Sequence, residues 1–144
     1  MSQWTHVAGM VRIDTLDGIV VRRDTIDTLR RIIIASNLPT GSEGSLHPAG
    51  LQTREHTSFS WGHIAIWGDL RDYGDARQVE ELCEWFGRLT QALLDEHYII
   101  RQAILQVEVE RVGSFTLSSR LAVEGNKSVV RIISVPVPEK MRKE

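Results

Sequence analysis

The residues with the clearest potential for chemistry combine aromatic rings, arginines and a glycine-rich segment, which together could enclose a planar anion. A tryptophan ring stacks on a nucleobase, an arginine guanidinium pairs with phosphate, and clustered backbone N–H groups bind the remaining oxygens. These features predict a binding site for a small anionic, nucleotide-type ligand. The candidate residues are Gly41, Ser42, Glu43, Gly44, Trp61, His63, Trp67, Asp69, Arg71 and Arg101.

Enzymatic chemistry has less support in the residue pattern. Cys83 is the only cysteine, and it falls on the apolar stripe of a predicted helix, which indicates core packing rather than a nucleophile. Asp69 and Asp72, close to Glu43, could supply acid–base carboxylates, although carboxylates between a strand and a helix are more often caps. We therefore assign no catalytic residue, and a small hydrolase or nuclease stays open as an alternative.

A metal centre and a phosphate-binding loop also lack their usual patterns. No histidine stands four residues from another on a predicted helix, so a site from His47, His56 and His63 would have to be assembled by the fold. Residues 40–45 contain no lysine and follow a predicted helix rather than a strand, unlike a P-loop. The alternative interpretation of residues 40–45 is an ordinary surface loop. We assign no metal ligand and no cofactor.

Composition limits the class of protein. The 144 residues are 42% hydrophobic and 25% charged, with a net charge of -2, which is typical of a globular domain and argues against nonspecific nucleic-acid binding. No apolar run approaches the ~20 residues of a membrane span, and the beginning of the chain lacks a signal pattern. A single cysteine fits a reducing compartment. We expect a soluble, cytoplasmic protein.

The most regular part of the sequence is a predicted strand, helix and strand between residues 59 and 109. In residues 59–70, Ile64 and Ile66 alternate with aromatic residues and histidine, which predicts one aliphatic face and one aromatic face. Asp75 can cap the following helix, whose apolar residues recur at helical spacing. That stripe comprises Val79, Leu82, Cys83, Phe86, Leu89 and Leu93.

The remaining segments add further strands and one helix. In the predicted strand at residues 99–109, alternation places Ile99, Arg101 and Ala103 on one face and Ile100 on the other. We also expect strands at residues 4–14, 18–22, 115–123 and 128–135, a turn at residues 15–18, a helix at residues 24–37 opened by Asp24, an irregular loop at residues 37–57 and a flexible tail at residues 136–144.

These elements predict a single α+β domain over residues 1–144. Its two helices would pack on a mixed, mostly antiparallel sheet of about five or six strands, of ferredoxin-like type. The strand–helix–strand unit fits a right-handed parallel crossover, and an antiparallel arrangement stays open. The aliphatic face would pack under a helix. The aromatic face would be a second packed layer or a surface for a ligand or subunit.

Residues 4–7, 40–44 and 66–73 together resemble segments of small proteins encoded in tailed-bacteriophage genomes, a group without an assigned function. The resemblance spans most of the chain and implies a phage or prophage origin and a role inside the infected bacterium. It implies no catalytic residue. In that setting, our hypothesis is a non-enzymatic protein that sequesters a nucleotide signal of bacterial defence.

A homo-oligomeric interaction module is the alternative to a ligand-binding protein. In this interpretation Trp61 and Trp67 are buried against a second subunit, because small α+β domains often cover an exposed sheet face in this way. The surface arginines then need no separate explanation. We expect an oligomer in either case.

Overall fold

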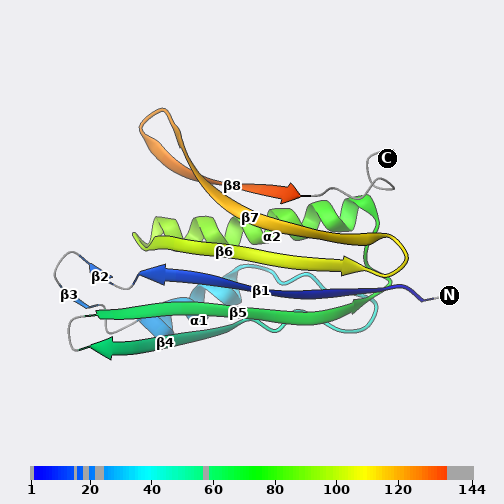
Figure 1. Ribbon diagram of the computed structural model, residues 1–144, viewed down its shortest axis with the longest axis horizontal. Helices are drawn as coiled ribbons and strands as arrows, with labels where there is room; N and C mark the ends of the chain where they lie inside the picture. Colours follow the sequence, from blue (N-terminus) through cyan, green and yellow to red (C-terminus); the bar gives the residue numbers. More distant parts are fainter. Residues whose placement is uncertain (1, 15, 18–19, 22–24, 57–58, 136–144) are drawn as a thin grey trace.

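The computed structural model describes residues 2–14, 16–17, 20–21, 25–56 and 59–135, without the side chains of residues 16–17, 20–21, 51–56, 59–61 and 135. The described chain forms two helices, one six-stranded sheet and one short two-stranded sheet (Figure 1). The elements in chain order are β1 (Trp4–Asp14), β2 (Leu16–Asp17), β3 (Val20–Val21), α1 (Thr25–Ala35), β4 (Ala49–His56), β5 (Phe59–Arg71), α2 (Ala76–Asp95), β6 (Ile99–Val109), β7 (Gly113–Glu124) and β8 (Lys127–Val135).

The large sheet has the strand order β4-β5-β1-β6-β7-β8, and every neighbouring pair is antiparallel. The prediction of two helices on a sheet of five or six strands is confirmed, whereas the prediction of a mixed sheet is wrong. β5 and β6 run in the same direction on either side of α2 in the chain. They do not pair with each other, because β1 lies between them and pairs with both.

Both helices pack on one face of the large sheet, and they lie behind it in the view of Figure 1. The predicted aliphatic face of β5 is buried there, with Ile64, Ile66 and Leu70 at most 2% exposed. The opposite face, which we call the open face, is covered by no helix or strand of the described chain. The face assignment made from the alternation in β5 is therefore confirmed.

α2 begins with a capping box and buries four residues of the apolar stripe expected from its sequence, Leu82, Phe86, Leu89 and Leu93, while Val79 and Cys83 are partly buried. The Asp75 carboxylate accepts the Gln78 backbone N–H at 2.8 Å, and the Gln78 side chain accepts the Asp75 N–H at 3.2 Å. Trp85, which the stripe did not include, is fully buried and donates its indole N–H to the Ser36 hydroxyl at 3.0 Å. This bond ties α2 to the residue after α1.

The prediction of an irregular loop over residues 37–57 is wrong, because β4 occupies Ala49–His56. β4 is an edge strand of the large sheet, and within the described chain it pairs with β5 alone. Its sequence shows no apolar alternation, so the local pattern contains no strand signal and the pairing with β5 determines its conformation. Residues before β4 also bridge to the sheet, since Leu46 pairs with Gly68.

The face assignment at the beginning of β6 is also wrong. The register between β1 and β6 shifts between Arg12 and Ile13, which inserts a bulge opposite this point. Beyond the bulge the alternation is reversed, so Ile100 packs against the core and Ile99 is 51% exposed. A single extra residue cannot be detected in an otherwise regular apolar alternation.

The strands expected at residues 4–14, 115–123 and 128–135 and the helix expected at residues 24–37 are present as β1, β7, β8 and α1, whereas strand β2 occupies Leu16–Asp17, where a turn at residues 15–18 was expected. The hairpin of β7 and β8 joins at Gly125, which has a φ of 63°. The short return strand is present as β3, paired with β2, while the predicted tail at residues 136–144 and the cap at Asp24 lie outside the described residues. Neither helix of the described chain combines the length and apolar character that a bilayer span requires.

The bond between Trp85 and Ser36 generates a stability prediction. Ser36→Ala leaves the buried indole N–H without an acceptor, so the free energy of unfolding should fall by about 1–3 kcal/mol. In a Trp85→Phe background the same substitution should cost less, because no indole N–H is present. Urea denaturation of the four proteins measures the difference, and an equal cost in both backgrounds would contradict the bond.

Candidate functional site

The structure separates the ten predicted binding residues into three places. The glycine-rich segment lies beside Arg71 at the end of β5, Trp67 and Asp69 lie on the open face, and His63 and Arg101 lie toward the opposite end of the sheet. The backbone of Trp61 pairs within β5, but its side chain is outside the described part. The described residues therefore do not enclose one common ligand.

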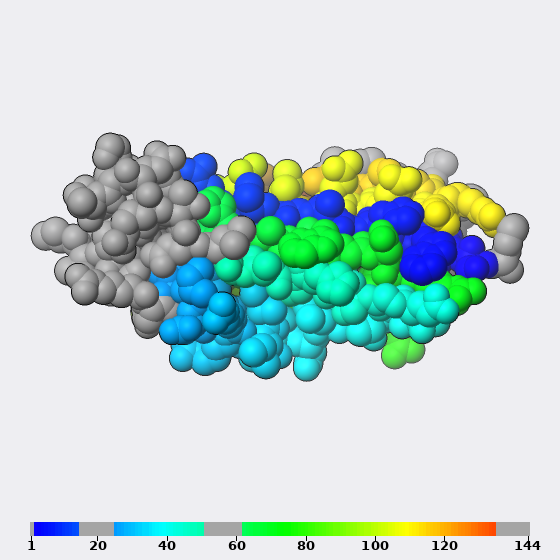
Figure 2. All heavy atoms as spheres, turned by 90° about the horizontal axis from the view of Figure 1, so that it is seen from below, coloured from blue at the N-terminus to red at the C-terminus, as the bar shows by residue number. Residues whose placement is uncertain are grey.

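The glycine-rich segment is docked on the end of β5 by its own backbone. Gly41 donates its N–H to Gly44 O at 3.2 Å, and Ser42 donates to Arg71 O at 2.9 Å. Arg71 in turn donates its backbone N–H to Glu43 O at 3.0 Å. Figure 2 shows this part of the chain, in cyan, lying along β5, in green. Two of the N–H groups that an anion nest would use are thus already bonded.

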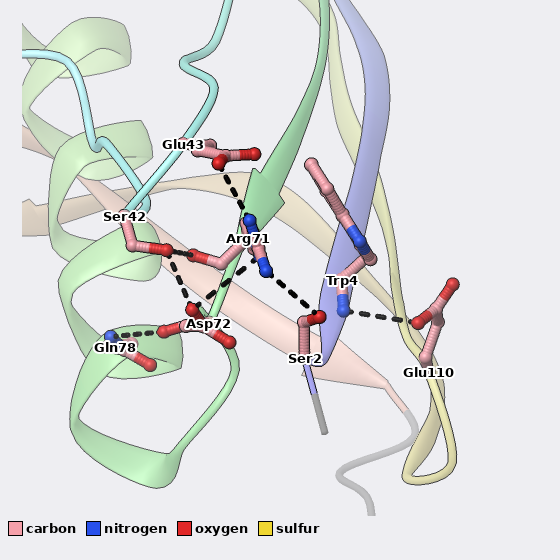
Figure 3. A network of polar contacts seen from close by, with 8 residues as sticks. All are labelled: Ser2, Trp4, Ser42, Glu43, Arg71, Asp72, Gln78 and Glu110. Atoms are coloured by element: carbon pink, nitrogen blue, oxygen red, sulfur yellow. Dashed lines mark hydrogen bonds and ion pairs between the residues drawn. The ribbon is translucent and has the colours of Figure 1, made fainter.

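Side chains around Arg71 reinforce this docking (Figure 3). The Arg71 guanidinium donates to the Glu43 carboxylate at 2.7 Å and to the Ser2 hydroxyl at 3.3 Å. The Ser42 hydroxyl donates to the Asp72 carboxylate at 2.8 Å, and this bond is the main reason why the pKa of Asp72 lies below its usual value. The cluster joins the loop, the end of β5 and the chain before β1, which is a structural role.

A second charged cluster lies on the open face beside β1. His6 Nδ1 is 2.6 Å from Asp69 Oδ1, and His6 Nε2 is 3.3 Å from Glu110 Oε1. Both ring nitrogens face carboxylates, so the imidazolium form, with two donors, fits this site. The hydrogen bond with the Asp69 carboxylate is the main reason why the pKa of His6 is raised. Partial burial of the ring lowers this pKa, and the contact with Glu110 raises it further.

The centre of the open face is apolar and exposed. Trp67 is 49% exposed, Met10 37% and Ile104 39%, and they lie on the three adjacent strands β5, β1 and β6. A shallow depression of about 420 Å³ beside Trp67 is also lined by Asp69 and Glu108. The tryptophan is thus available for contact, in surroundings that carry carboxylates.

The other end of the open face carries basic groups. Arg12 lies directly between His63 on β5 and Gln102 on β6. Partial burial, with Arg12 as the second cause, lowers the pKa of His63. Arg101, at the bulge, contacts Asp14 at 2.9 Å. The open face therefore changes from acidic to apolar to basic along the strands.

The alternative chemistries gain no site among the described side chains. Cys83 is partly buried against the core, and burial raises the pKa of its thiol to about 11, so it is protonated at neutral pH. Asp69, Asp72 and Glu43 contact three different partners, namely His6, Ser42 and Arg71. Within the described part, no three histidine, cysteine or acidic residues lie close enough together to hold a metal ion.

An apolar cavity of about 210 Å³ lies away from this surface, between the beginning of β6, the hairpin of β7 and β8, and the end of α2. The pairing of β6 with β7 begins only at Ile104 and Ser118, and the tip of the hairpin curves away from β6 (Figure 1). Leu94, Tyr98 and Leu121 line the space that this divergence leaves.

Sequence reasoning missed most of the open face. Met10, Ile104 and Glu108 join Trp67 and Asp69 only through the pairing of β1 with β5 and β6. The alternation within β1 and β6 does separate the two faces of each strand. Which residues of the different strands lie side by side, however, depends on the strand order, and no short sequence motif predicts that order.

Comparison of the chain with protein-family models, curated proteins and solved structures found no match. The interpretation of the site therefore rests on its geometry.

The docked loop generates a second stability prediction. Gly44 and Gly125 both have positive φ, 79° and 63°, so alanine at either position costs about 1–2 kcal/mol of backbone strain. A Cβ on Gly44 would also lie 2.0 Å from Asp69 O, whereas a Cβ on Gly125 would meet nothing within 4 Å. Gly44→Ala should therefore lower the free energy of unfolding by about 1–3 kcal/mol more than Gly125→Ala. Equal losses in urea denaturation would contradict the docking.

The cluster of His6 generates a titration prediction. By NMR, the pKa of His6 should lie above 6.5. Asp69→Asn should lower it more than Glu110→Gln does, and the control Glu43→Gln should leave it unchanged. Because the folded pKa is the higher one, the contribution of the cluster to stability is complete below about pH 6.5 and is lost as pH rises through the folded pKa. The His6 side chain is 43% exposed, so solvent screening keeps that contribution small. A pKa at or below 6.5 would contradict the bonding.

Proposed function

We propose that this chain is a non-enzymatic binding protein that buries the open face of its sheet against a protein partner. The observation that carries the proposal is the exposed group of Trp67, Met10 and Ile104 at the centre of that face. Tryptophan and methionine are enriched in protein interfaces, and an antiparallel sheet that faces only water usually alternates to polar residues on that side. Here the centre of the open face carries exposed apolar residues, while polar residues occupy its two ends.

A protein partner is supported better than the nucleotide-type ligand expected from the sequence. Asp69, Glu108 and His6 line the depression beside Trp67, so a phosphate bound there would face two carboxylates and an imidazole whose ring nitrogens already contact Asp69 and Glu110. The arginines that were to pair with the phosphate lie elsewhere, since Arg71 bonds Glu43 and Arg101 contacts Asp14. A flat apolar centre with charged ends is a common arrangement for contact between proteins.

The fold and the biological setting complete the proposal. The succession β1-α1-β4-β5-α2-β6, with β4-β5-β1-β6 as neighbours, supports a ferredoxin-like unit that is extended by the hairpin of β7 and β8. The resemblance to small phage-encoded proteins supports action inside an infected bacterium.

Native mass spectrometry of the protein purified from its bacterial host tests the proposed function. The wild type should carry additional protein mass above its own 16.3 kDa, and Trp67→Ser should lose it, because the substitution removes the largest exposed apolar side chain among the described side chains of the open face. The matched control is Ile34→Ser on α1, where an 81% exposed isoleucine lies on a helix rather than on this face. This control should keep the partner.

Two results would overturn the proposed function. One is a wild type without associated protein. The other is a complex that survives Trp67→Ser. A retained mass in the nucleotide range would instead support the small-ligand interpretation.

A further inference from the structure

We propose that the partner on the open face is a second copy of this chain, packed face to face about a twofold axis that runs across the strands. The inference rests on the proposed function and adds the identity and orientation of the partner. Its basis is the arrangement of side chains on the open face, which is self-complementary about one axis and not about the other.

Strand pairing orders the central side chains of the open face into four rows. Each row contains one residue from β5, one from β1 and one from β6, and the rows follow one another at two-residue steps along the strands. The rows are Asp69, His6 and Glu108; Trp67, Ala8 and Gln106; Ala65, Met10 and Ile104; and His63, Arg12 and Gln102.

A twofold axis across the strands reverses the order of the rows and keeps β5 over β5 and β1 over β1. With the axis between the second and third rows, Trp67 of one copy faces Ala65 of the other. Ala8 likewise faces Met10. On β5 and β1 each large side chain thus meets an alanine, which is the arrangement that lets two apolar surfaces interdigitate. On β6, Gln106 of one copy faces Ile104 of the other.

The same axis brings together two ends of the open face that differ in net charge. It places the row of Asp69, His6 and Glu108 over the row of His63, Arg12 and Gln102 in the other copy, where Arg12 is the cation because burial and Arg12 itself lower the pKa of His63. The Arg12 guanidinium then faces the His6 imidazole directly, and the two carboxylates on the neighbouring strands flank this contact and outweigh the charge of His6. Complementary potentials of this kind fix the register of an interface.

The alternative twofold axis, parallel to the strands, gives unfavourable contacts. It keeps each row over itself and exchanges β5 with β6, so Asp69 of one copy faces Glu108 of the other. Met10 also faces Met10, and Ala8 faces Ala8, which crowds one contact and leaves a gap at the next. Like charges in an interface oppose association, so the pattern of charges selects the axis across the strands.

The open face approaches the size that a stable dimer needs. Six strands about 4.8 Å apart and about 11 residues long, at roughly 3.3 Å per residue, span roughly 850 Å², including the hairpin of β7 and β8, whose tip curves away from β6 (Figure 1). Stable interfaces bury about 800 Å² on each partner. Two such faces would pack about 10 Å apart with their strands roughly aligned, as in a β-sandwich.

Disulfide cross-linking between two single-cysteine variants tests the partner and the axis together. In a Cys83→Ser background, which removes the only other thiol, Ala8→Cys and Met10→Cys are expressed separately and mixed. Both positions are exposed, so the substitutions leave the core intact. Air oxidation and mass spectrometry under non-reducing conditions should show the mixed disulfide far above the share that random pairing gives. Ile34→Cys, on α1, should form none.

The outcomes separate the inference from the proposed function. The axis parallel to the strands predicts a different result. Two copies of Ala8→Cys would then form a disulfide with each other, as would two copies of Met10→Cys, and the mixed disulfide would be missing. This result would overturn the proposed arrangement. A partner of a different mass that is lost in Trp67→Ser overturns the second copy while the proposed function stands. A dimer that persists in Trp67→Ser and does not cross-link overturns both.

Discussion

The structure depends on one strand that forms hydrogen bonds along both of its edges. β1 pairs with β5 on one side and with β6 on the other, over nearly its whole length. Because both partners are antiparallel to β1, they run in the same direction, and α2 connects them across the covered face. The helices and the open face follow from this arrangement. The two charged ends of the open face are also set by it, since each row joins side chains from all three strands.

The parts of the fold that could be predicted are those in which local pattern and tertiary environment agree. The alternation of Ile64 and Ile66 indicates which face of β5 is buried, and Asp75 indicates where α2 begins. In both cases a few neighbouring residues are enough for the prediction. β4 shows the opposite case, because its conformation comes from pairing with β5 and its own sequence carries no periodicity. The bulge opposite Arg12 reverses the faces at the start of β6, and a regular alternation conceals it.

The candidate site was predicted less well than the fold, because the same residue types serve more than one structural purpose. Glycine spacing suggested an anion nest at residues 41–44, yet the same glycines are needed where the chain approaches β5 closely, as the 2.0 Å from a Cβ on Gly44 to Asp69 O indicates. Glycine permits both uses, and sequence spacing does not distinguish them. Trp67 was predicted as a binding residue on a face that was either packed or exposed, but its neighbours Met10 and Ile104 come from other strands of the sheet.

The central position of β1 also determines the order in which the fold can be completed during synthesis. Thr5 pairs with Val109 on β6, while the opposite edge of β1 pairs with β5, which is nearer in sequence. A strand made early therefore keeps one unpaired edge until more than half of the chain has followed it. Contacts between residues so far apart in the sequence slow folding. An unpaired strand edge can form hydrogen bonds with other chains in the meantime. The β4–β5 pairing and α2, whose contacts are local, can form in that interval, and we expect slow translation between β5 and β6 to prolong the time in which the nascent chain can misassemble.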